Sequence, residues 1–141
     1  RVVITRFGIV LGRNGGALGQ MVPLFRRFVG GPLGSGRQWF SWIHMEDLLG
    51  AFSFLLERPD ADGPYNLVAP GAVTNRDLAR ALGRALHRPS FMPAPALAIR
   101  LVLGEFGNVL LKGQRAVPRR LSELGYDFRS PGIDQALASV V

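Results

Sequence analysis

The sequence has no cysteine, a single lysine and only two histidines among its 141 residues. The absence of cysteine excludes disulfide bonds, zinc–thiolate sites and thiol catalysis. Two histidines are too few for a histidine-rich metal centre, so we predict no metal site. A chain of this length buries about 70% of the surface of its unfolded state, which is enough for one domain without a cross-link.

The sequence also lacks a charged-then-apolar leader and any uninterrupted apolar run of the length that crosses a membrane. From these absences we predict that the chain has no signal peptide and makes no membrane contact, and we expect a cytoplasmic protein. The chain opens at Arg1 directly into a β-branched run, Val2 to Thr5, which is typical of the middle of a sheet. We therefore expect the chain to be a fragment of a longer protein.

The net charge is +7, and Lys112 is the only basic residue besides histidine that is not an arginine. Such a charge can attract phosphates or nucleic acid. The arginines are spread along the chain and not clustered with aromatic residues, which disfavours nucleic-acid binding. The four-residue spacing from Arg76 to Arg88 predicts a solvated helix face, with anion binding as the alternative. A non-catalytic basic module for an acidic partner or nucleic acid stays an alternative function.

The stretch from Gly30 to Asp47 carries most of the functional information. Its first seven residues contain five glycines or prolines, which favour a loop. Residues Gln38 to Ile43 favour a strand, and a helical period begins at His44 with acidic residues near the helix start. A loop, a strand and a helix start thus meet here, and pockets are often built at such junctions.

Hydrophobic patterns predict the other elements. Continuous apolar runs predict strands at Val2 to Thr5, buried on both faces, and at Tyr65 to Val68, parallel to other strands. Helical spacing predicts helices with one face at Leu18, Met21, Phe25 and Phe28, from His44 to about Arg58, and from a Thr74–Asp77 capping box to His87. Two short helices are expected between Ala96 and Leu111, separated by breaks at Gly104 and Gly107. A further helix is expected from Pro118 to Gly125, and a last one after a Ser130 cap, with Ile133, Ala136 and Leu137 facing inward.

No set of residues in the chain predicts a catalytic centre. His44 has Ser41 and Asp47 as neighbours in sequence, but the alternation of a strand directs Ser41 and His44 to opposite faces. We interpret His44 mainly as a hydrogen-bonded structural residue at a strand-to-helix turn. We interpret Asp47 as stabilising the helix start or pairing with an arginine.

The aromatic residues of the central stretch allow two interpretations. Trp39, Phe40 and Trp42 either line an apolar pocket, in which Arg37 or Gln38 orients a polar group, or form a core under the loop. The glycines of this loop are not followed by a helix N-terminus, so the pattern does not predict a phosphate-binding loop.

Several motifs, taken in order, carry a resemblance to a known family. They are Arg6 to Gly12, Gly15 to Leu18, Gly30 to Asp47, Tyr65 to Pro70 and Gly113 to Pro118. In these motifs the chain resembles the C-terminal half of an atypical extended short-chain dehydrogenase/reductase of the sugar-nucleotide epimerase-like group, including its small C-terminal domain. The resemblance implies an α/β fold, the C-terminal part of a doubly wound, Rossmann-like parallel sheet plus a mainly helical substrate-side domain.

The resemblance also implies a division of the chain. Residues 1–70 would hold the last strands and helices of the NAD(P)-binding fold, with a substrate-side loop at 30–47, and residues 71–141 would form the helical domain. The parent would be an NAD(P)-dependent, epimerase-like oxidoreductase, with NADP favoured. The glycine-rich cofactor loop and the catalytic residues would belong to the preceding half, so the fragment alone is expected to be inactive.

The resemblance further implies site residues and partners. The cofactor would contact Arg6, Phe7 and Gly8 near its nicotinamide end. The substrate-binding residues would be Arg37, Gln38, Trp39, Phe40, Trp42 and His44. The implied partners are a small-molecule substrate and the missing N-terminal Rossmann half, and an open strand edge at Val2 to Thr5 suggests a homodimer.

Two positions depart from the family pattern. Gly8 stands where related enzymes carry an asparagine, and Phe40 stands where they carry an arginine that grips a nucleotide diphosphate. These departures predict a ligand that is less charged than a nucleotide sugar.

Overall fold

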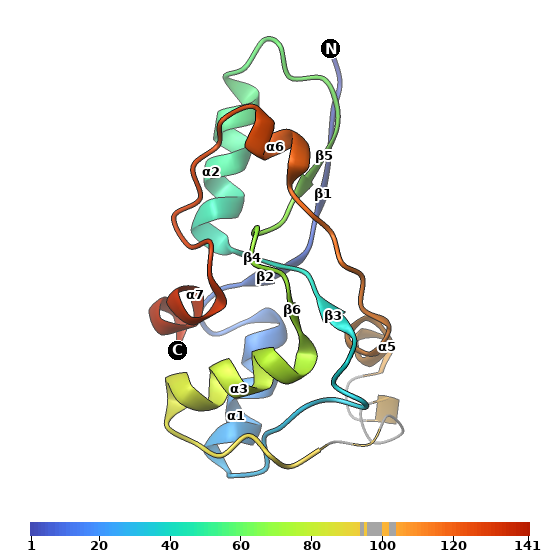
Figure 1. Ribbon diagram of the computed structural model, residues 1–141, viewed down its shortest axis with the longest axis vertical. Helices are drawn as coiled ribbons and strands as arrows, with labels where there is room; N and C mark the ends of the chain where they lie inside the picture. Colours follow the sequence, from blue (N-terminus) through green and yellow to red (C-terminus); the bar gives the residue numbers. More distant parts are fainter. Residues whose placement is uncertain (94, 96–99, 102–103) are drawn as a thin grey trace.

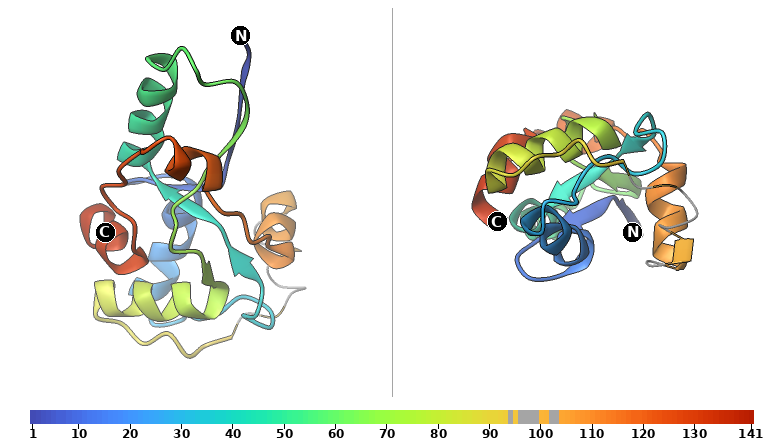
Figure 2. Two further views of the ribbon diagram at one scale, coloured as in Figure 1. Left: turned by 45° about the horizontal axis from the view of Figure 1, so that its top comes forward. Right: turned by 90° about the horizontal axis from the view of Figure 1, so that it is seen from below.

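The computed structural model describes residues 1–93, 95, 100–101 and 104–141, and everything below refers to these residues. Figure 1 shows strands β1 and β5 with helices α2 and α6 at one end of the molecule, and helices α1 and α3 at the other. The short strands β2 and β4 run between the two ends, with α7 on one side and α5 on the other. Figure 2 shows the same arrangement from two further directions. The chain is therefore of the mixed α/β class that the sequence predicted.

Two strands pair in parallel next to the N-terminus. β1 (Val3–Phe7) and β5 (Gly63–Leu67) align with Val3 opposite Gly63 and Phe7 opposite Leu67. Both lie close to predicted strands, and the helical crossover between them has the parallel geometry that the sequence indicated. The prediction that the first strand is buried on both faces is wrong, because Ile4 is 49% exposed on a face that no described element covers.

Two further strand pairs come from the central stretch. β2 (Ile9–Leu11) runs parallel to β4 (Trp42–His44), and β3 (Trp39–Phe40) runs antiparallel to β6 (Val73–Thr74). Ser41 separates β3 from β4, so the predicted strand forms as two short pieces that pair with different partners. Ser41 thus lies between two strand pairs.

Two helices follow the predicted signals closely. α2 (Met45–Leu56) begins directly after β4 and buries Leu48, Ala51 and Leu55. α3 (Asn75–Leu86) begins after Thr74, whose side chain accepts a hydrogen bond from the Asp77 backbone N–H at 3.3 Å. The predicted Thr74 cap is confirmed, and the Asp77 carboxylate accepts from the Thr74 hydroxyl at 2.9 Å, whereas in a full capping box it would accept from the Thr74 backbone N–H.

The remaining helices are α1 (Gly16–Arg26), α5 (Glu105–Lys112), α6 (Arg119–Glu123) and α7 (Ile133–Val140). Leu18, Met21 and Phe25 are buried in α1 as predicted, but Phe28 follows the helix with φ of 64° and is 57% exposed. Gly104 precedes α5 as expected, whereas Gly107 lies inside that helix and does not break it. The predicted face at Leu97 lies outside the described residues.

The last helix begins later than predicted. Gly132 is the residue that precedes α7, and the backbone N–H of Ser130 donates to the carboxyl group of Asp47 instead of Ser130 capping the helix. Asp47 thereby orders the chain before the helix, and the helix starts only at Ile133. Ile133, Ala136 and Leu137 are buried, as the spacing predicted.

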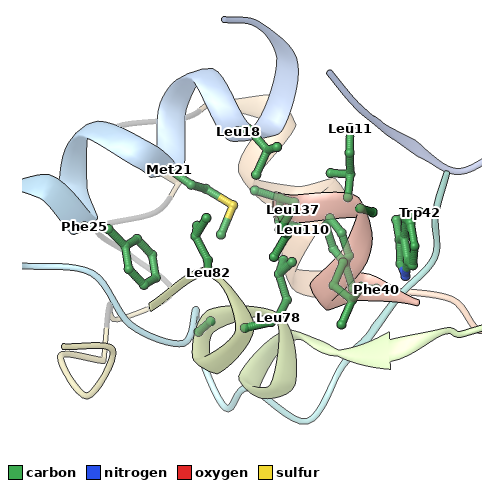
Figure 3. Close-up of a cluster of buried hydrophobic side chains, with 14 of the residues drawn as sticks. Leu11, Leu18, Met21, Phe25, Phe40, Trp42, Leu78, Leu82, Leu110 and Leu137 are labelled. Atoms are coloured by element: carbon green, nitrogen blue, oxygen red, sulfur yellow. The ribbon is translucent and has the colours of Figure 1, made fainter. Parts of the chain in front are cut away.

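Two hydrophobic clusters hold these elements together. The first, drawn in Figure 3, joins α1, α3 and α7 through Leu18, Met21, Leu82 and Leu137, and it also receives Phe40 and Trp42. The second lies between α2, α6 and the β1–β5 pair, and its fully buried members include Leu67 and Leu121. The strands β3 and β4 join the two clusters, because Phe40 belongs to the first and Ile43 to the second.

Candidate functional site

A cavity of about 650 Å³ lies at the carboxyl end of β1. In open parallel sheets, ligands bind outside the carboxyl ends of the strands, so this position is the expected one for a site. The strand exit Arg6, Phe7 and Gly8 lines one side of the cavity. Trp39 and Phe40 from β3 and the segment 113–117 after α5 line the other. The cavity therefore contains residues from both the predicted cofactor set and the predicted substrate set.

Gly8 allows two strand corners to approach each other at the cavity. A Cβ atom at position 8 would lie 2.5 Å from the carbonyl oxygen of Ser41 and 2.8 Å from its carbonyl carbon. The next residue, Ile9, donates its backbone N–H to the same Ser41 oxygen at 2.9 Å. An asparagine at this position would displace Ser41, so the glycine has a packing cause in this chain.

The two aromatic residues of β3 have different surroundings. Trp39 is 38% exposed and presents its ring toward the segment 113–117, whereas Phe40 is only 2% exposed. Figure 3 shows Phe40 and Leu110 in the first hydrophobic cluster, and both also line the cavity. Phe40 is therefore a core residue that also borders the cavity, Trp39 borders the cavity, and Trp42 lies in the core only.

The segment 113–117 is the part of the site that the sequence did not assign. The Ser41 hydroxyl donates to the carbonyl oxygen of Gln114 and accepts from the backbone N–H of Ala116 at 2.9 Å. Asn66 of β5 donates its side-chain N–H to the carbonyl oxygen of Val117 at 3.3 Å. The guanidinium of Arg115 lies 4.8 Å from the centre of the Trp39 ring. The sequence signal available was the Gly113 to Pro118 motif, which carried the resemblance but no site role.

Four residues of the predicted substrate set do not line the cavity. Gln38 donates its side-chain N–H to the carbonyl oxygens of Leu33 at 2.9 Å and Leu110 at 3.2 Å, which joins the 30–37 loop to α5. Arg37 lies on the exposed turn next to it, where its backbone N–H donates to Ser35 Oγ. Trp42 is fully buried, and its indole N–H donates to the carbonyl oxygen of Gly71 at 3.0 Å.

His44, the fourth of these residues, is a buried capping residue. Its Nδ1 accepts from the backbone N–H of Glu46 at 3.1 Å, and its Nε2 lies 2.7 Å from the hydroxyl of Ser139. Both ring nitrogens are thus engaged within the fold, which confirms the structural interpretation. The Ser41 hydroxyl bonds elsewhere, so the two residues form no pair, as the strand alternation predicted.

Asp47 is a fully buried carboxyl group at the first turn of α2. It accepts hydrogen bonds from the backbone N–H groups of Arg129 at 2.8 Å and Ser130 at 2.9 Å, and from the Tyr126 hydroxyl at 3.1 Å. Burial, followed by the nearby charge of Asp47, raises the pKa of Tyr126 to about 12. Asp47 therefore ties the start of α2 to the segment that leads into α7.

Other hollows of the described surface contain none of the predicted site residues. A cavity of about 470 Å³ lies between α1 and the last residues of the chain, and one of about 500 Å³ lies at the end of α3. The second is bordered by Arg80, Arg84 and Arg88. Arg84 forms an ion pair with Asp134 at 2.9 Å and Arg80 lies 3.8 Å from Asp77, so part of this arginine face is paired with acidic side chains.

Comparison with known proteins finds one family model and several relatives similar to this chain. Residues 94–140 match a domain of unknown function, DUF1731. The chain is 48% identical over its full length to the mouse epimerase family protein SDR39U1 and covers 48% of that protein. It is 44% identical over its full length to the chloroplastic homologue from Arabidopsis thaliana and covers 41% of that protein.

A solved structure shows the same architecture. Human epimerase family protein SDR39U1, isoform 2, solved with NADPH, superposes with a TM-score of 0.91 at 42% identity over 98% of this chain and 47% of the human chain. The parallel strands and these matches define a mixed α/β chain with the Rossmann-like fold of its structural neighbours. The chain is similar over its full length to epimerase family proteins, which confirms the resemblance seen in the sequence.

The chain spans about half the length of the curated relatives it matches. Among the described residues, no helix is long and apolar enough to cross a membrane.

Proposed function

We propose that this chain supplies the substrate side of the active-site cleft in an NAD(P)-dependent, epimerase-like oxidoreductase. One observation carries the proposal: a single cavity at the carboxyl end of β1 is lined by the strand exit Arg6 to Gly8 and by Trp39 and Phe40. The first group was predicted to face the cofactor and the second the substrate. A cleft that accepts both is what a hydride-transferring enzyme requires.

The cavity fits the nicotinamide end of a dinucleotide. Phe7 offers an apolar wall, and Gly8 lets the Ser41 backbone close the corner of the cavity where β1 meets β2. NAD(P), when bound, supplies a hydride acceptor or donor, and in this proposal Arg6, Phe7 and Gly8 position that end of the molecule. We favour NADP over NAD, and the human relative solved with NADPH supports this choice.

The predicted substrate residues have two roles in this proposal. Trp39 and Phe40 contact the substrate directly, since both line the cavity. The other predicted substrate residues influence the substrate indirectly, by holding the cavity wall in place; they are Arg37, Gln38, Trp42 and His44. Gln38 fixes the loop against α5, and Trp42 and His44 anchor β4. We also retain the division into residues 1–70 and 71–141 as a proposal, in which the second part brings the segment 113–117 to the cleft.

One apolar surface of the chain is exposed, and we propose that the remaining half of the parent protein packs against it. Met45, Leu49 and Leu56 form an apolar stripe on α2 and are 42%, 59% and 76% exposed. Next to this stripe, the outer edge of β1 pairs with no described strand. The relatives contain about as much chain again as the part matched here, and a parallel sheet with an open edge is completed by further strands.

The partner proposal is tested by Leu49→Asp in the parent protein. We expect a lower midpoint of thermal unfolding, because a charge would be buried against the other half. Leu24→Asp on α1, which is 40% exposed and distant from the α2 stripe, is the control and should have a smaller effect. Equal midpoints of thermal unfolding for the parent and Leu49→Asp would contradict the proposal that the other half covers this surface. An effect of Leu49→Asp that disappears on dilution would assign the surface to a homodimer.

We propose a cytoplasmic location for the parent, which cell fractionation would check.

Nucleotide binding tests the proposed function directly. NADPH and NADH are titrated into the parent protein, and binding is followed by nicotinamide fluorescence. We expect NADPH to bind more tightly, and Phe7→Ala to weaken binding by roughly tenfold through loss of an apolar wall worth about 1–2 kcal/mol. Phe91→Ala, at a residue that is 73% exposed and away from the cavity, is the control and should bind normally. The absence of binding by either nucleotide would overturn the proposal.

A further inference from the structure

We propose that the cleft recognises a substrate with a flat apolar body and an anionic group, carboxylate or phosphate, that Arg115 binds while stacked on Trp39. This inference deepens the proposed function and rests on it. Arg115 is then a specificity-determining residue, and Ser41 is the residue that positions it.

The charge of the cavity lining is the first observation. Arg6 and Arg115 both line it, and no acidic residue does among the described residues. Neither arginine forms an ion pair in the described part of the chain, and the residues outside that part carry no acidic side chain. Two cations without a local counter-charge favour an anionic ligand, because a cleft focuses the field of the charges that line it.

The geometry of Arg115 is the second observation. Its guanidinium lies 4.8 Å from the centre of the Trp39 ring, a distance typical of a cation–π contact. In the proposed complex the guanidinium keeps its face toward the Trp39 ring, and its in-plane N–H groups bind the ligand. No side-chain N–H of Arg115 donates to an acceptor within the described residues. A planar fork with available donors matches the two oxygens of a carboxylate or phosphate.

The third observation is that the segment carrying Arg115 is fixed on both sides of it. Ser41 bonds Gln114 and Ala116, the residues immediately before and after Arg115. Gly113 has φ of 48° and lies so close to the Trp39 backbone that a Cβ atom would overlap the Trp39 carbonyl oxygen. Removing the Ser41 hydroxyl would therefore release Arg115 from Trp39 without removing either side chain.

The lining of the cavity indicates that the rest of the ligand is flat and apolar. Phe7, Trp39 and Phe40 lie around it, and the cavity of about 650 Å³ has room for a ring system beside the arginine. The family pattern predicted an arginine at position 40, and its replacement by Phe40 predicted a less charged ligand. In the folded chain, Arg115 brings a guanidinium to the same cavity from another segment, so the ligand need not be neutral.

Matched aromatic probes test the proposal in the intact parent protein. Naphthoate, naphthyl phosphate and the neutral naphthamide share one ring system, and isothermal titration calorimetry gives the dissociation constant of each with and without NADPH. We expect at least one anion to bind about tenfold more tightly than naphthamide, since a charge-assisted hydrogen bond contributes about 1.5 kcal/mol or more. The two anions separate a carboxylate-binding from a phosphate-binding cleft.

Variants connect this preference to Arg115 and Ser41. Arg115→Gln should abolish the preference for the anion and leave naphthamide binding nearly unchanged, while Arg115→Lys should keep part of it. Ser41→Ala should lower the preference, and Ser41→Thr, which keeps a hydroxyl, should restore it. Arg119→Gln is the control, because Arg119 is exposed on α6 and does not line the cavity. A variant that merely loosened the fold would weaken all probes alike.

The outcomes separate this inference from the proposed function. Equal binding of the three probes, no binding of any probe at millimolar concentration, or an unchanged preference in Arg115→Gln would overturn the inference. Normal NADPH binding together with any of these results would leave the proposed function standing. A preference that depends on Arg115 in a protein that does not bind NADPH would support the anion site and contradict the proposed cofactor.

Discussion

Asp47 shows at the residue scale how one buried side chain holds distant parts of the chain together. Its carboxyl group receives the backbone N–H groups of Arg129 and Ser130 and the hydroxyl of Tyr126. These donors lie about eighty positions further along the chain, so the contact closes a large loop. The end of the chain is therefore positioned by the same turn that follows the site strands β3 and β4.

Replacing Asp47 by alanine should destabilise the parent protein by about 2–4 kcal/mol, because buried donors would lose their acceptor. Chemical denaturation followed by circular dichroism measures the change. Asp127→Ala is the control, since Asp127 is exposed one residue after Tyr126. A loss in Asp47→Ala no larger than that in the control would contradict the role given to Asp47.

The phenol of Tyr126 makes a pH-dependent contribution to stability. Its pKa is raised to about 12 in the folded chain, first by burial and then by Asp47, from an ordinary value of 10.0. Between these two values the unfolded state binds fewer protons than the folded state, so stability should fall as the pH rises from 10 to 12. In Tyr126→Phe this part of the loss should be absent. Denaturation midpoints measured across this pH range check it, and parallel curves for the two proteins would refute it.

Individual residues were predictable from sequence where their role is local. The strand-to-helix turn indicated a hydrogen-bonded, structural His44, and the structure shows it capping α2 through the backbone N–H of Glu46. Arg115 was not predictable, because its partner Trp39 lies 76 positions away and no local pattern encodes the Ser41 contacts that join them. The partners of Asp47 were missed for the same reason.

At the scale of elements, the start of α3 is the clearest case of a local signal that determines structure. Thr74 and Asp77 exchange hydrogen bonds at the helix N-terminus, and the helix follows immediately. The same helix buries Leu78 and Leu82 in the first cluster. A weaker cap would therefore loosen the wall against which Phe40 packs.

Thr74→Ala should destabilise the parent protein by about 1 kcal/mol, the usual effect of losing an N-cap side chain. Thr74→Ser keeps the hydroxyl and should restore most of the stability. The comparison of the two denaturation midpoints checks the prediction. Equal destabilisation by both substitutions would show that the methyl group, not the cap, is what matters.

The elements that sequence predicted poorly are those that depend on contacts across the fold. The start of α7 was placed at Ser130, but Asp47 engages the Ser130 backbone and the helix begins at Ile133. The Gln38 to Ile43 strand was predicted as one piece, yet it divides at Ser41 to pair with two different strands. Hydrophobic periodicity predicts whether a segment is a helix or a strand, but it does not predict the contacts across the fold that set where the segment begins and ends.

At the scale of the whole molecule, the first hydrophobic cluster borders the cavity through Phe40 and Leu110. β3 and β4 contribute to both clusters, and the cavity lies between the β1 exit and the segment 113–117. The α/β class and the resemblance to epimerase-like proteins followed from the sequence, because the order of its motifs is specific. The shape of the cleft did not, because it is made by residues from four separate stretches of the chain.

Hydrogen exchange of the intact parent protein, with and without NADPH, tests most directly whether this cavity is the cleft of an NAD(P)-dependent enzyme. Mass spectrometry resolves the segments that line the cavity, residues 6–9, 39–41 and 113–117, from residues 13–26 and 80–90, which border the other cavities. The account predicts slower exchange on NADPH binding at 6–9 and in the segments facing it, with no change at 13–26 or 80–90. Bound NADPH that leaves all three lining segments unprotected, or that protects 13–26 or 80–90 instead, would contradict it.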